Sequence, residues 1–373
     1  MTWQPVRSDE RYSSLDLLRG FALFGVLIIN LLYFFRLSLW DHILRHHSHP
    51  GWANHAVDAI AATLVEFKAF DLFAFTFGIG MMIQAERARK RGVSAEVFLL
   101  RRFIILLAIG SFHMLLIANV DILMLYAVCG LLLIIVLRLP ATALAMAGLA
   151  AIYLPTLLPL GPTLPAESVL RQWAADATRI YGHGNFAIIV AFRWRETRDL
   201  IAPVLAESAQ NTAGMMMLGM AAWRFGIIRA PERFRVQLWI FAACAGTAGL
   251  LGWLGSHVPL ALAYAAILLA SGVSPATSKW TGPVAAAGQM ALTSYLAQSI
   301  VFGLIFYGYG GGLFGQLATA PVAIFGIAFY IAQLFFSQWW LSRYRFGPFE
   351  WIWRSLTYGR RQPMSLNPTP QER

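Results

Sequence analysis

The chain has 373 residues, of which 58% are hydrophobic and only 13% are charged. So few charges do not cover a soluble globule of this length, so the surplus apolar surface is expected to face lipid. The formal net charge of +11 does not indicate nucleic-acid binding, because the basic residues cluster at the ends of apolar runs and no soluble module presents them.

Apolar runs recur along the whole chain, many near the ~18–20 residues that a helix needs to cross a bilayer. The runs are continuous and rich in Leu, Ala, Ile and Phe, which predicts an all-α, polytopic membrane helix bundle of about ten spanning helices. The predicted spans are 16–36, 57–84, 101–118, 121–138, 141–160, 203–224, 236–255, 258–273, 284–307 and 319–341.

The basic residues between the second and third runs set the expected orientation. Arg87, Arg89, Lys90, Arg91, Arg101 and Arg102 form the strongest cluster. By the positive-inside rule this loop lies in the cytoplasm. With ten crossings, both termini are then cytoplasmic, and we expect a multi-pass protein of the bacterial inner membrane.

The predicted domain organisation is simple. Residues 1–363 form a single transmembrane helical domain, and residues 364–373 form a polar, disordered tail. Residues 165–200 alternate aromatic and charged side chains, which is typical of helices that lie along a membrane interface. This stretch is therefore expected to form an extracytoplasmic amphipathic cap.

Polar residues inside membrane helices are costly, so a shared depth indicates a function. Five predicted helices place polar groups in one layer of the outward half of the bilayer. These are Asn30, Lys68, Asp71, His113, Gln210 and Gln298, each roughly 18–24 Å from the cytoplasmic end of its helix at ~1.5 Å per residue.

Asp121 starts the fourth predicted helix, within reach of His113. A carboxylate that fixes the tautomer of an imidazole makes the other ring nitrogen a competent general base. Tyr295 and Gln298 could then stabilise an oxyanion. The structural alternative is that His113 forms a hydrogen bond with a nearby carbonyl group while Asp121 caps a helix.

Other polar groups have simpler interpretations. Lys68 and Asp71 could neutralise each other on one helix face, although they also belong to the polar layer of candidate substrate residues with Gln210. At the cytoplasmic side, Arg11, Arg19, Arg101 and Arg102 could hold the phosphates of a ligand or act as topology signals.

The histidines at 42, 46, 47, 49 and 55 lack a regular ligand spacing, so no metal site is expected.

Several motifs resemble those of the YeiB-like bacterial membrane proteins, the family called domain of unknown function 418. The motifs are Ser14 to Gly25 (SLDLLRGFALFG), Phe75 to Gly80 (FTFGIG), Gly110 to His113 (GSFH), Gly288 to Ser299 (GQMALTSYLAQS), Phe306 to Gly310 (FYGYG) and Gly347 to Gly359 (GPFEWIWRSLTYG). The resemblance covers nearly the whole chain.

The amino-terminal motif is also distantly similar to that of transmembrane acyltransferases. That likeness implies transfer of an acyl group from a cytosolic donor, with acyl-CoA as co-substrate and no permanently bound cofactor, to an extracytoplasmic glycan or lipid hydroxyl. It further implies that Asp16, Arg19 and Asn30 line the donor path. The acting base is His113 rather than His49 in this interpretation. A transporter, or a lipid- or quinone-binding protein that uses the same cavity, is the alternative.

Overall fold

The structure is a computed structural model that describes residues 12–44, 49–118, 120–157, 165–198, 202–252, 257–272 and 278–366. Within these ranges the regular elements are helices, joined by one isolated β-bridge between Tyr344 and Ser365. The predicted all-α fold class is confirmed.

The helices follow the predicted runs. In chain order they are α1 (Ser13–Asn30), α2 (Leu39–Ile43), α3 (Trp52–Ile60), α4 (Lys68–Lys90), α5 (Ala95–Leu116), α6 (Ile122–Leu133), α7 (Ala141–Leu157), α8 (Glu167–His183), α9 (Phe186–Glu196), α10 (Ala202–Arg224), α11 (Arg235–Leu250), α12 (Val258–Ser271), α13 (Ser278–Gln289), α14 (Ala291–Phe306), α15 (Thr319–Leu341) and α16 (Pro348–Tyr358). A π-helical turn, Leu31–Phe35, extends α1, and another, Ala61–Val65, extends α3.

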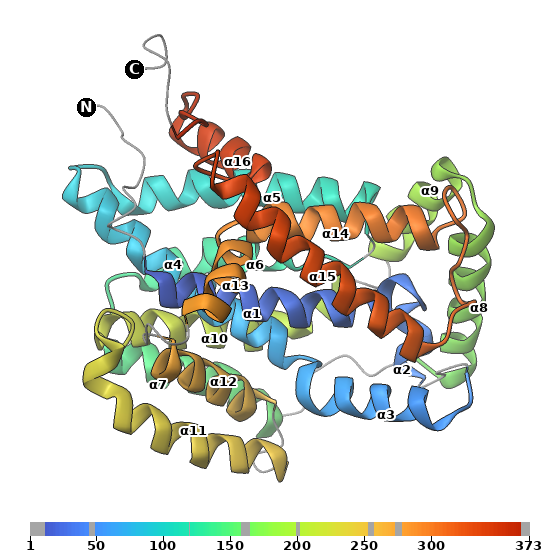
Figure 1. The fold of residues 1–373 in the computed structure, drawn as a ribbon, viewed down its shortest axis with the longest axis horizontal. Helices are drawn as coiled ribbons and strands as arrows, with labels where there is room; N and C mark the ends of the chain where they lie inside the picture. Colours follow the sequence, from blue (N-terminus) through green and yellow to red (C-terminus); the bar gives the residue numbers. More distant parts are fainter. Residues whose placement is uncertain are drawn as a thin grey trace.

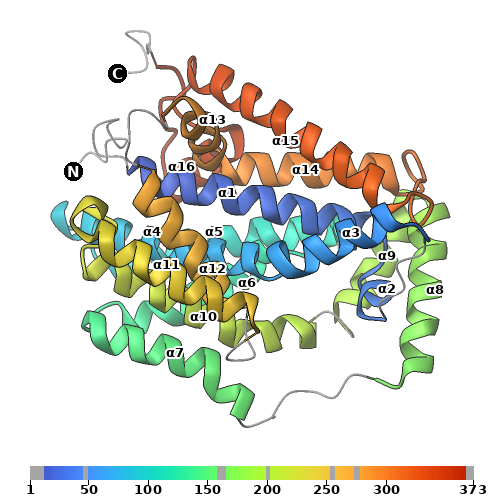
Figure 2. The same cartoon turned by 60° about the horizontal axis from the view of Figure 1, so that its bottom comes forward.

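The long helices run along the long axis of the molecule, with α1 at the centre of the bundle (Figure 1). Two views agree that α16 lies near one end of the bundle, close to the start of α1, whereas α8 crosses the opposite end almost at right angles (Figures 1 and 2). The bundle therefore has two distinct ends.

Membrane-length helices are present in the described part of the chain. Three segments, Ser13–Phe35, Ala95–Leu116 and Thr319–Leu341, are long and apolar enough to cross a bilayer, and the bent pair α13–α14 would make a fourth. Large apolar side chains on α15 and α5 point outward: Phe335 is 69% exposed and Ile104 is 52% exposed. Such faces suit lipid contact. Ten crossings and cytoplasmic termini stay predictions.

Two spans that we predicted as continuous are broken. The span 57–84 is interrupted after Ala61–Val65, where Phe67 adopts a φ of 61° that no helix interior allows. The span 284–307 bends by 82° at Met290, between α13 and α14. Neither break is marked by a proline at the bend, so periodicity alone did not reveal them.

Glycines bring pairs of helices into backbone contact. A Cβ added at Gly288 of α13 would lie 1.9 Å from the carbonyl oxygen of Asp16 on α1, and a Cβ added at Gly20 of α1 would lie 2.0 Å from the carbonyl oxygen of Val284 on α13. Helices α4 and α10 are equally close, because a Cβ added at Gly78 of α4 would lie 1.9 Å from the carbonyl oxygen of Met216. Small residues at helix crossings are the usual means of close packing in membranes.

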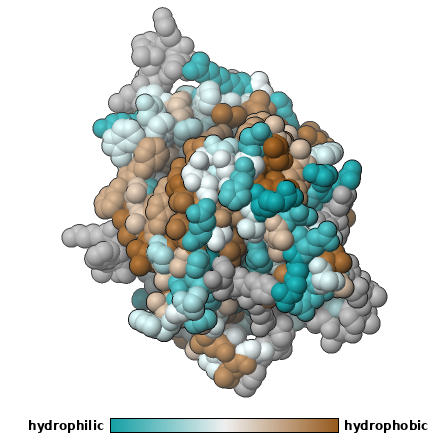
Figure 3. Space-filling model, turned by 90° about the vertical axis from the view of Figure 1, so that its right-hand side faces the viewer, coloured by the Kyte–Doolittle hydropathy of each residue, from teal (hydrophilic) through white to brown (hydrophobic). Residues whose placement is uncertain are grey.

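The stretch 165–200, which we predicted to form a cap, contains α8 and α9 at the end opposite α16. Glu196 of α9 holds this end together, because it accepts hydrogen bonds from Trp40 Nε1 (2.8 Å) and from the Tyr181 hydroxyl (2.6 Å). Gly308 N donates to the Tyr181 carbonyl at 2.7 Å, so the glycine-rich turn packs against α8. Hydrophilic residues run through the middle of this end face, with apolar residues along one flank (Figure 3).

The segment 364–373, which we predicted to be a disordered tail, begins with paired residues. Arg345 N donates to the Met364 carbonyl, and Leu366 N donates to the Arg343 carbonyl. Residues 367–373 lie outside the described residues.

We expect Gly288→Ala to destabilise the protein by about 1–3 kcal/mol, because the added methyl group would separate α1 from α13. Gly282 on the same helix has no atom within 4 Å of an added Cβ. Gly282→Ala is therefore the matched control, and it should leave stability unchanged or raise it by up to ~1 kcal/mol through helix propensity. Thermal unfolding of the detergent-purified variants checks both, and equal midpoints would contradict the packing argument.

Candidate functional site

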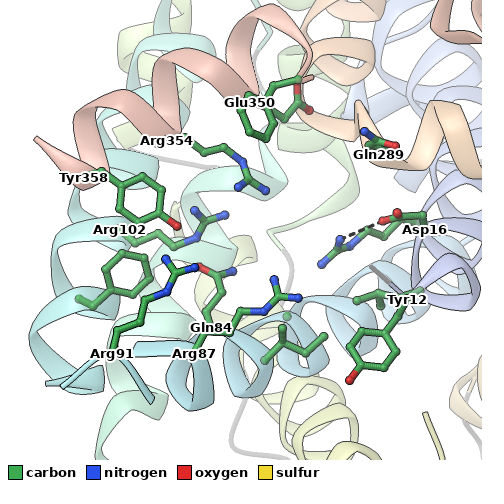
Figure 4. Close-up of a pocket in the computed structure, with 16 residues that line it drawn as sticks. Tyr12, Asp16, Gln84, Arg87, Arg91, Arg102, Gln289, Glu350, Arg354 and Tyr358 are labelled. Carbon is green, nitrogen blue, oxygen red and sulfur yellow. Dashed lines mark hydrogen bonds and ion pairs between the residues drawn. The ribbon is translucent and has the colours of Figure 1, made fainter. Parts of the chain in front are cut away.

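A basic pocket opens at the end of the bundle where α16 lies. It is lined by Tyr12, Leu15, Asp16, Arg19, Gly80, Ile83, Gln84, Arg87, Arg91, Phe98, Arg102, Gln289, Phe346, Glu350, Arg354 and Tyr358. The lining thus contains five arginines and two carboxylates. The guanidinium groups of Arg87, Arg91, Arg102 and Arg354 point into the same space (Figure 4). Such a pocket favours an anionic ligand with several negative charges.

Neighbouring groups fix two of these arginines. Arg19 Nη1 lies 3.5 Å from Asp16 Oδ1, and its Nη2 lies close over Gly80, 2.8 Å from where a Cβ would stand. The Arg102 guanidinium stacks on the Trp353 ring at 3.5 Å, and Trp353 Nε1 donates to the Arg102 carbonyl at 3.1 Å. Stacking holds the charge in place without neutralising it.

Glu350 of α16 caps α14 from outside its own helix. Its carboxylate accepts from Leu292 N at 2.7 Å, from Thr293 N at 3.1 Å and from the Thr293 hydroxyl. These donors are the otherwise unsatisfied N–H groups at the start of α14. Burial raises the pKa of the Glu350 carboxyl above its ordinary value, and the hydrogen bonds from Thr293 lower it in part.

An apolar chamber continues inward from the basic pocket. Seven residues line both, namely Arg19, Gly80, Gln84, Arg102, Gln289, Glu350 and Arg354. Beyond them the walls become apolar and aromatic, with Leu23, Val26, Phe73, Phe77, Met81, Phe103 and Leu106, and the chamber reaches Tyr126 and Tyr295. The two cavities together suit a ligand with an anionic head and an apolar tail.

The structure brings the predicted pair His113 and Asp121 together with Tyr295. His113 Nδ1 lies 3.3 Å from Asp121 Oδ1, and the Tyr295 hydroxyl donates to the same oxygen at 3.1 Å. The rings of His113 and Tyr295 lie 5.0 Å apart. Asp121 also caps α6, because it accepts hydrogen bonds from Leu123 N and Met124 N, as the structural alternative predicts. The side chain of His113 is only 1% exposed.

An outer cavity of about 1010 Å³ lies on the far side of Tyr126. Its lining combines aromatic rings with histidines and carboxylates: Ile29, Tyr33, Phe34, Leu39, His42, Ile43, His55, Asp58, Ala59, Ala62, Glu66, Phe67, Phe70, Asp71, Val120, Ile122, Leu125, Tyr126, Ser208, Asn211, Thr212 and His257. Ile122 and Tyr126 also line the apolar chamber. One residue layer therefore separates the two cavities.

Two histidine–carboxylate pairs line the outer cavity. His257 Nδ1 lies 2.6 Å from Asp71 Oδ2, while Asn211 Nδ2 donates to the other oxygen of Asp71, also at 2.6 Å. His42 Nε2 lies 2.6 Å from Glu66 Oε1. Lys68 Nζ donates to the Ala62 carbonyl at 2.8 Å, so the carboxylate of Asp71 is engaged by His257 and Asn211 rather than by Lys68.

Other residues of the predicted site lie elsewhere. Gln298 is buried and donates to Gln333 Oε1 of α15 at 2.8 Å, and Asn30 is 8% exposed; neither residue lines the basic pocket, the apolar chamber or the outer cavity. Gln210 is exposed, and its neighbour Asn211 faces the cavity instead.

Among the predicted phosphate-binding arginines, Arg101 is exposed, with its guanidinium beside Gly359, outside the pocket. Arg11, like His46 and His47, lies outside the described residues. Within the described ranges, no group of three or more His, Cys, Asp or Glu side chains is arranged to hold a metal ion.

Sequence reasoning missed several residues of the site. Glu350 and Arg354 stand in the quoted carboxyl-terminal motif, so the motif itself was the available signal. Arg87 and Arg91 were interpreted as topology signals alone. His257 and Asn211 carry no local pattern, and their role depends on Asp71 being close in space.

The fold and the site define an all-helical protein with membrane-length apolar helices and a basic pocket built from residues of five helices or their ends, α1, α4, α5, α13 and α16. The chain belongs to the family described as "Protein of unknown function (DUF418)", whose model matches residues 202–360. This confirms the YeiB-like resemblance of the motifs.

Relatives match over nearly their whole length. The chain is 31% identical to "Uncharacterized protein YxaH" of Bacillus subtilis, with 97% of this chain and 98% of the relative covered. It is 28% identical to "Uncharacterized protein YeiB" of Escherichia coli, with 93% and 96% covered. No solved structure matches the chain.

We expect Glu350 to make stability depend on pH. Because its folded-state pKa is raised, its contribution is present in full below the unfolded pKa and is lost as pH rises through the folded pKa. Glu350→Gln should therefore gain thermal stability relative to the unmodified protein as pH rises from the ordinary glutamate range to neutrality. Glu167→Gln, on the exposed face of α8 where the side chain pairs with Arg171, is the control for removing a surface carboxylate. A pH-independent difference between Glu350→Gln and the unmodified protein would contradict the assignment.

Proposed function

We propose that this protein is a membrane-embedded acyltransferase that takes an acyl group from a cytosolic donor such as acyl-CoA and transfers it to an extracytoplasmic hydroxyl. One observation carries the proposal: residues of four quoted motifs, on α1, α4, α13 and α16, line a basic pocket that opens into an apolar chamber. Acyl-CoA has the matching parts, a polyphosphorylated head and an acyl tail.

The charge distribution supports the donor end of this proposal. Five guanidinium groups against two carboxylates leave a net positive lining, and planar guanidinium groups bind phosphate with paired hydrogen bonds. The acyl chain would enter between the aromatic side chains Phe73, Phe77 and Phe103. Its thioester would then lie near Tyr295.

In this proposal the chain is a multi-pass protein of the bacterial inner membrane, with both termini and the basic pocket on the cytoplasmic side. The three long apolar helices, the bent pair α13–α14 and three shorter apolar helices would supply seven of the ten predicted crossings, and α4, α10 and α11 would supply the other three. The cap formed by α8 and α9, and the outer cavity, then face the opposite compartment, where a glycan or lipid acceptor is found.

His113 and Asp121 act on Tyr295 in this scheme. Asp121 accepts a hydrogen bond from the Tyr295 hydroxyl, and the His113 ring packs against the Tyr295 ring at a tilt of 45°. The buried pair His113 and Asp121 thereby orients the Tyr295 hydroxyl, and of these three residues only Tyr295 lines the apolar chamber. From there the Tyr295 hydroxyl could steady the thioester oxygen.

The donor pocket is tested by the neighbouring arginines at the start of α5. Arg102 lines the pocket and Arg101 does not, although the sequence alone favoured both. We expect Arg102→Ala to weaken binding of radiolabelled coenzyme A to the purified protein by roughly 10- to 100-fold, the effect of losing a charged hydrogen bond. Arg101→Ala should bind as the unmodified protein does.

Equal loss in both variants would indicate a general charge effect instead of a pocket. Binding of coenzyme A without any covalently altered product would favour the second candidate function, a transporter or lipid-binding protein. The observation behind that candidate is that the inner and outer cavities share the wall formed by Ile122 and Tyr126.

A further inference from the structure

We infer that His257 is the general base that deprotonates an acceptor hydroxyl in the outer cavity, with Asp71 and Asn211 as its positioning residues. The inference deepens the proposed acyl transfer and rests on it. It assigns the catalytic histidine to the start of α12, whereas the sequence motifs favoured His113.

The hydrogen bonds of His257 leave one ring nitrogen available. An ionised carboxylate only accepts, so the 2.6 Å contact with Asp71 requires the proton on Nδ1 and leaves Nε2 as an acceptor. Asn211 holds the second oxygen of Asp71. The carboxylate is thus fixed at both oxygens, and it fixes the tautomer of the imidazole.

Accessibility separates His257 from the other paired histidines. Its side chain is 29% exposed and lines the outer cavity. His113 is 1% exposed and lines none of the three cavities. His42 bonds Glu66 through Nε2 and stacks on Tyr33 at 4.0 Å, while its Nδ1 is buried, so that nitrogen is not presented to a ligand in the cavity.

The backbone beside this histidine is strained. Phe67 has a φ of 61°, which is unfavourable for a bulky aromatic residue. Its ring stacks on His257, with 5.0 Å between centroids and 24° between planes. The strained residue therefore covers one face of the imidazole and restricts its rotation.

The base lies in the cavity adjacent to the donor chamber. Tyr126 lines both cavities, and its hydroxyl donates to the carbonyl of Phe70, the residue before Asp71, at 2.6 Å. Asp71 therefore directly follows, in the chain, the residue whose carbonyl anchors the dividing wall. A shift of the Tyr126 side chain would bring the thioester and the acceptor into one space.

The lining of the outer cavity favours a sugar as the acceptor. It combines the carboxylates of Asp58 and Glu66 and the amide of Asn211 with aromatic side chains such as Phe34, and this mixture of hydrogen-bonding and aromatic groups suits a sugar. In the transfer, the sugar oxygen attacks the thioester carbonyl while its proton passes to His257 Nε2. The C–O bond forms, the C–S bond breaks, and coenzyme A leaves as the thiolate. His257 then returns its proton to solvent, and the thiolate takes one up.

The test uses everted membrane vesicles from cells that express the full chain in place of the natural copy. Vesicles receive [¹⁴C]acetyl-CoA, and label that becomes covalently bound to the membrane fraction is counted. We expect His257→Gly to lower incorporation roughly 100-fold or more, the usual contribution of a general base. Binding of coenzyme A should be unchanged, and added imidazole should restore incorporation by occupying the vacated space. His183→Gly, at the exposed end of α8, is the control and should need no imidazole.

Three outcomes would overturn the inference or its basis. Full incorporation by His257→Gly overturns the role of His257 alone. Loss that imidazole does not restore assigns His257 a structural role and overturns it too. Vesicles of the unmodified protein that neither bind coenzyme A nor incorporate label overturn the proposed function itself, and the inference falls with it.

Discussion

The arrangement of the inner site depends on one carboxylate, Glu350. The chain bends sharply at Met290, and the bend leaves the first N–H groups of α14 without partners in their own helix. Glu350 satisfies two of them and the Thr293 hydroxyl. The same contact holds α16 against the bundle, so that Arg354 faces the basic pocket and Trp353 lines the apolar chamber. A helix cap therefore serves as the support of a binding site.

Much of the fold was predictable because lipid exposure demands long apolar runs, and these runs are visible in the sequence. The breaks at Phe67 and Met290 were not predictable in this way. They depend on partners distant in sequence: His257 stacks on Phe67, and Glu350 caps the helix after Met290. A periodicity analysis considers neighbours along one helix, so it treats a broken span as a single one.

The candidate site was predictable only in part, for a related reason. Depth along a helix placed His113 and Asp121 together correctly, since one short turn joins their helices. Depth along a helix does not specify which way a side chain points around the helix axis. The predicted site therefore included Gln210, although its neighbour Asn211 faces the outer cavity, and it included Gln298, which donates a hydrogen bond to Gln333. The basic pocket was concealed further, because arginines at helix ends serve topology as readily as they serve ligand binding.

The wall at Tyr126 has a consequence for the membrane as an electrical barrier. A path lined by arginines at one end and by carboxylates at the other would conduct ions if it were continuous, and the cell would lose its transmembrane gradient. Tyr126 is 1% exposed, is anchored to the Phe70 carbonyl, and packs against Phe73 and Phe77. In a bundle that crosses the bilayer as proposed, this side chain separates the two cavities and so keeps the path closed to ions.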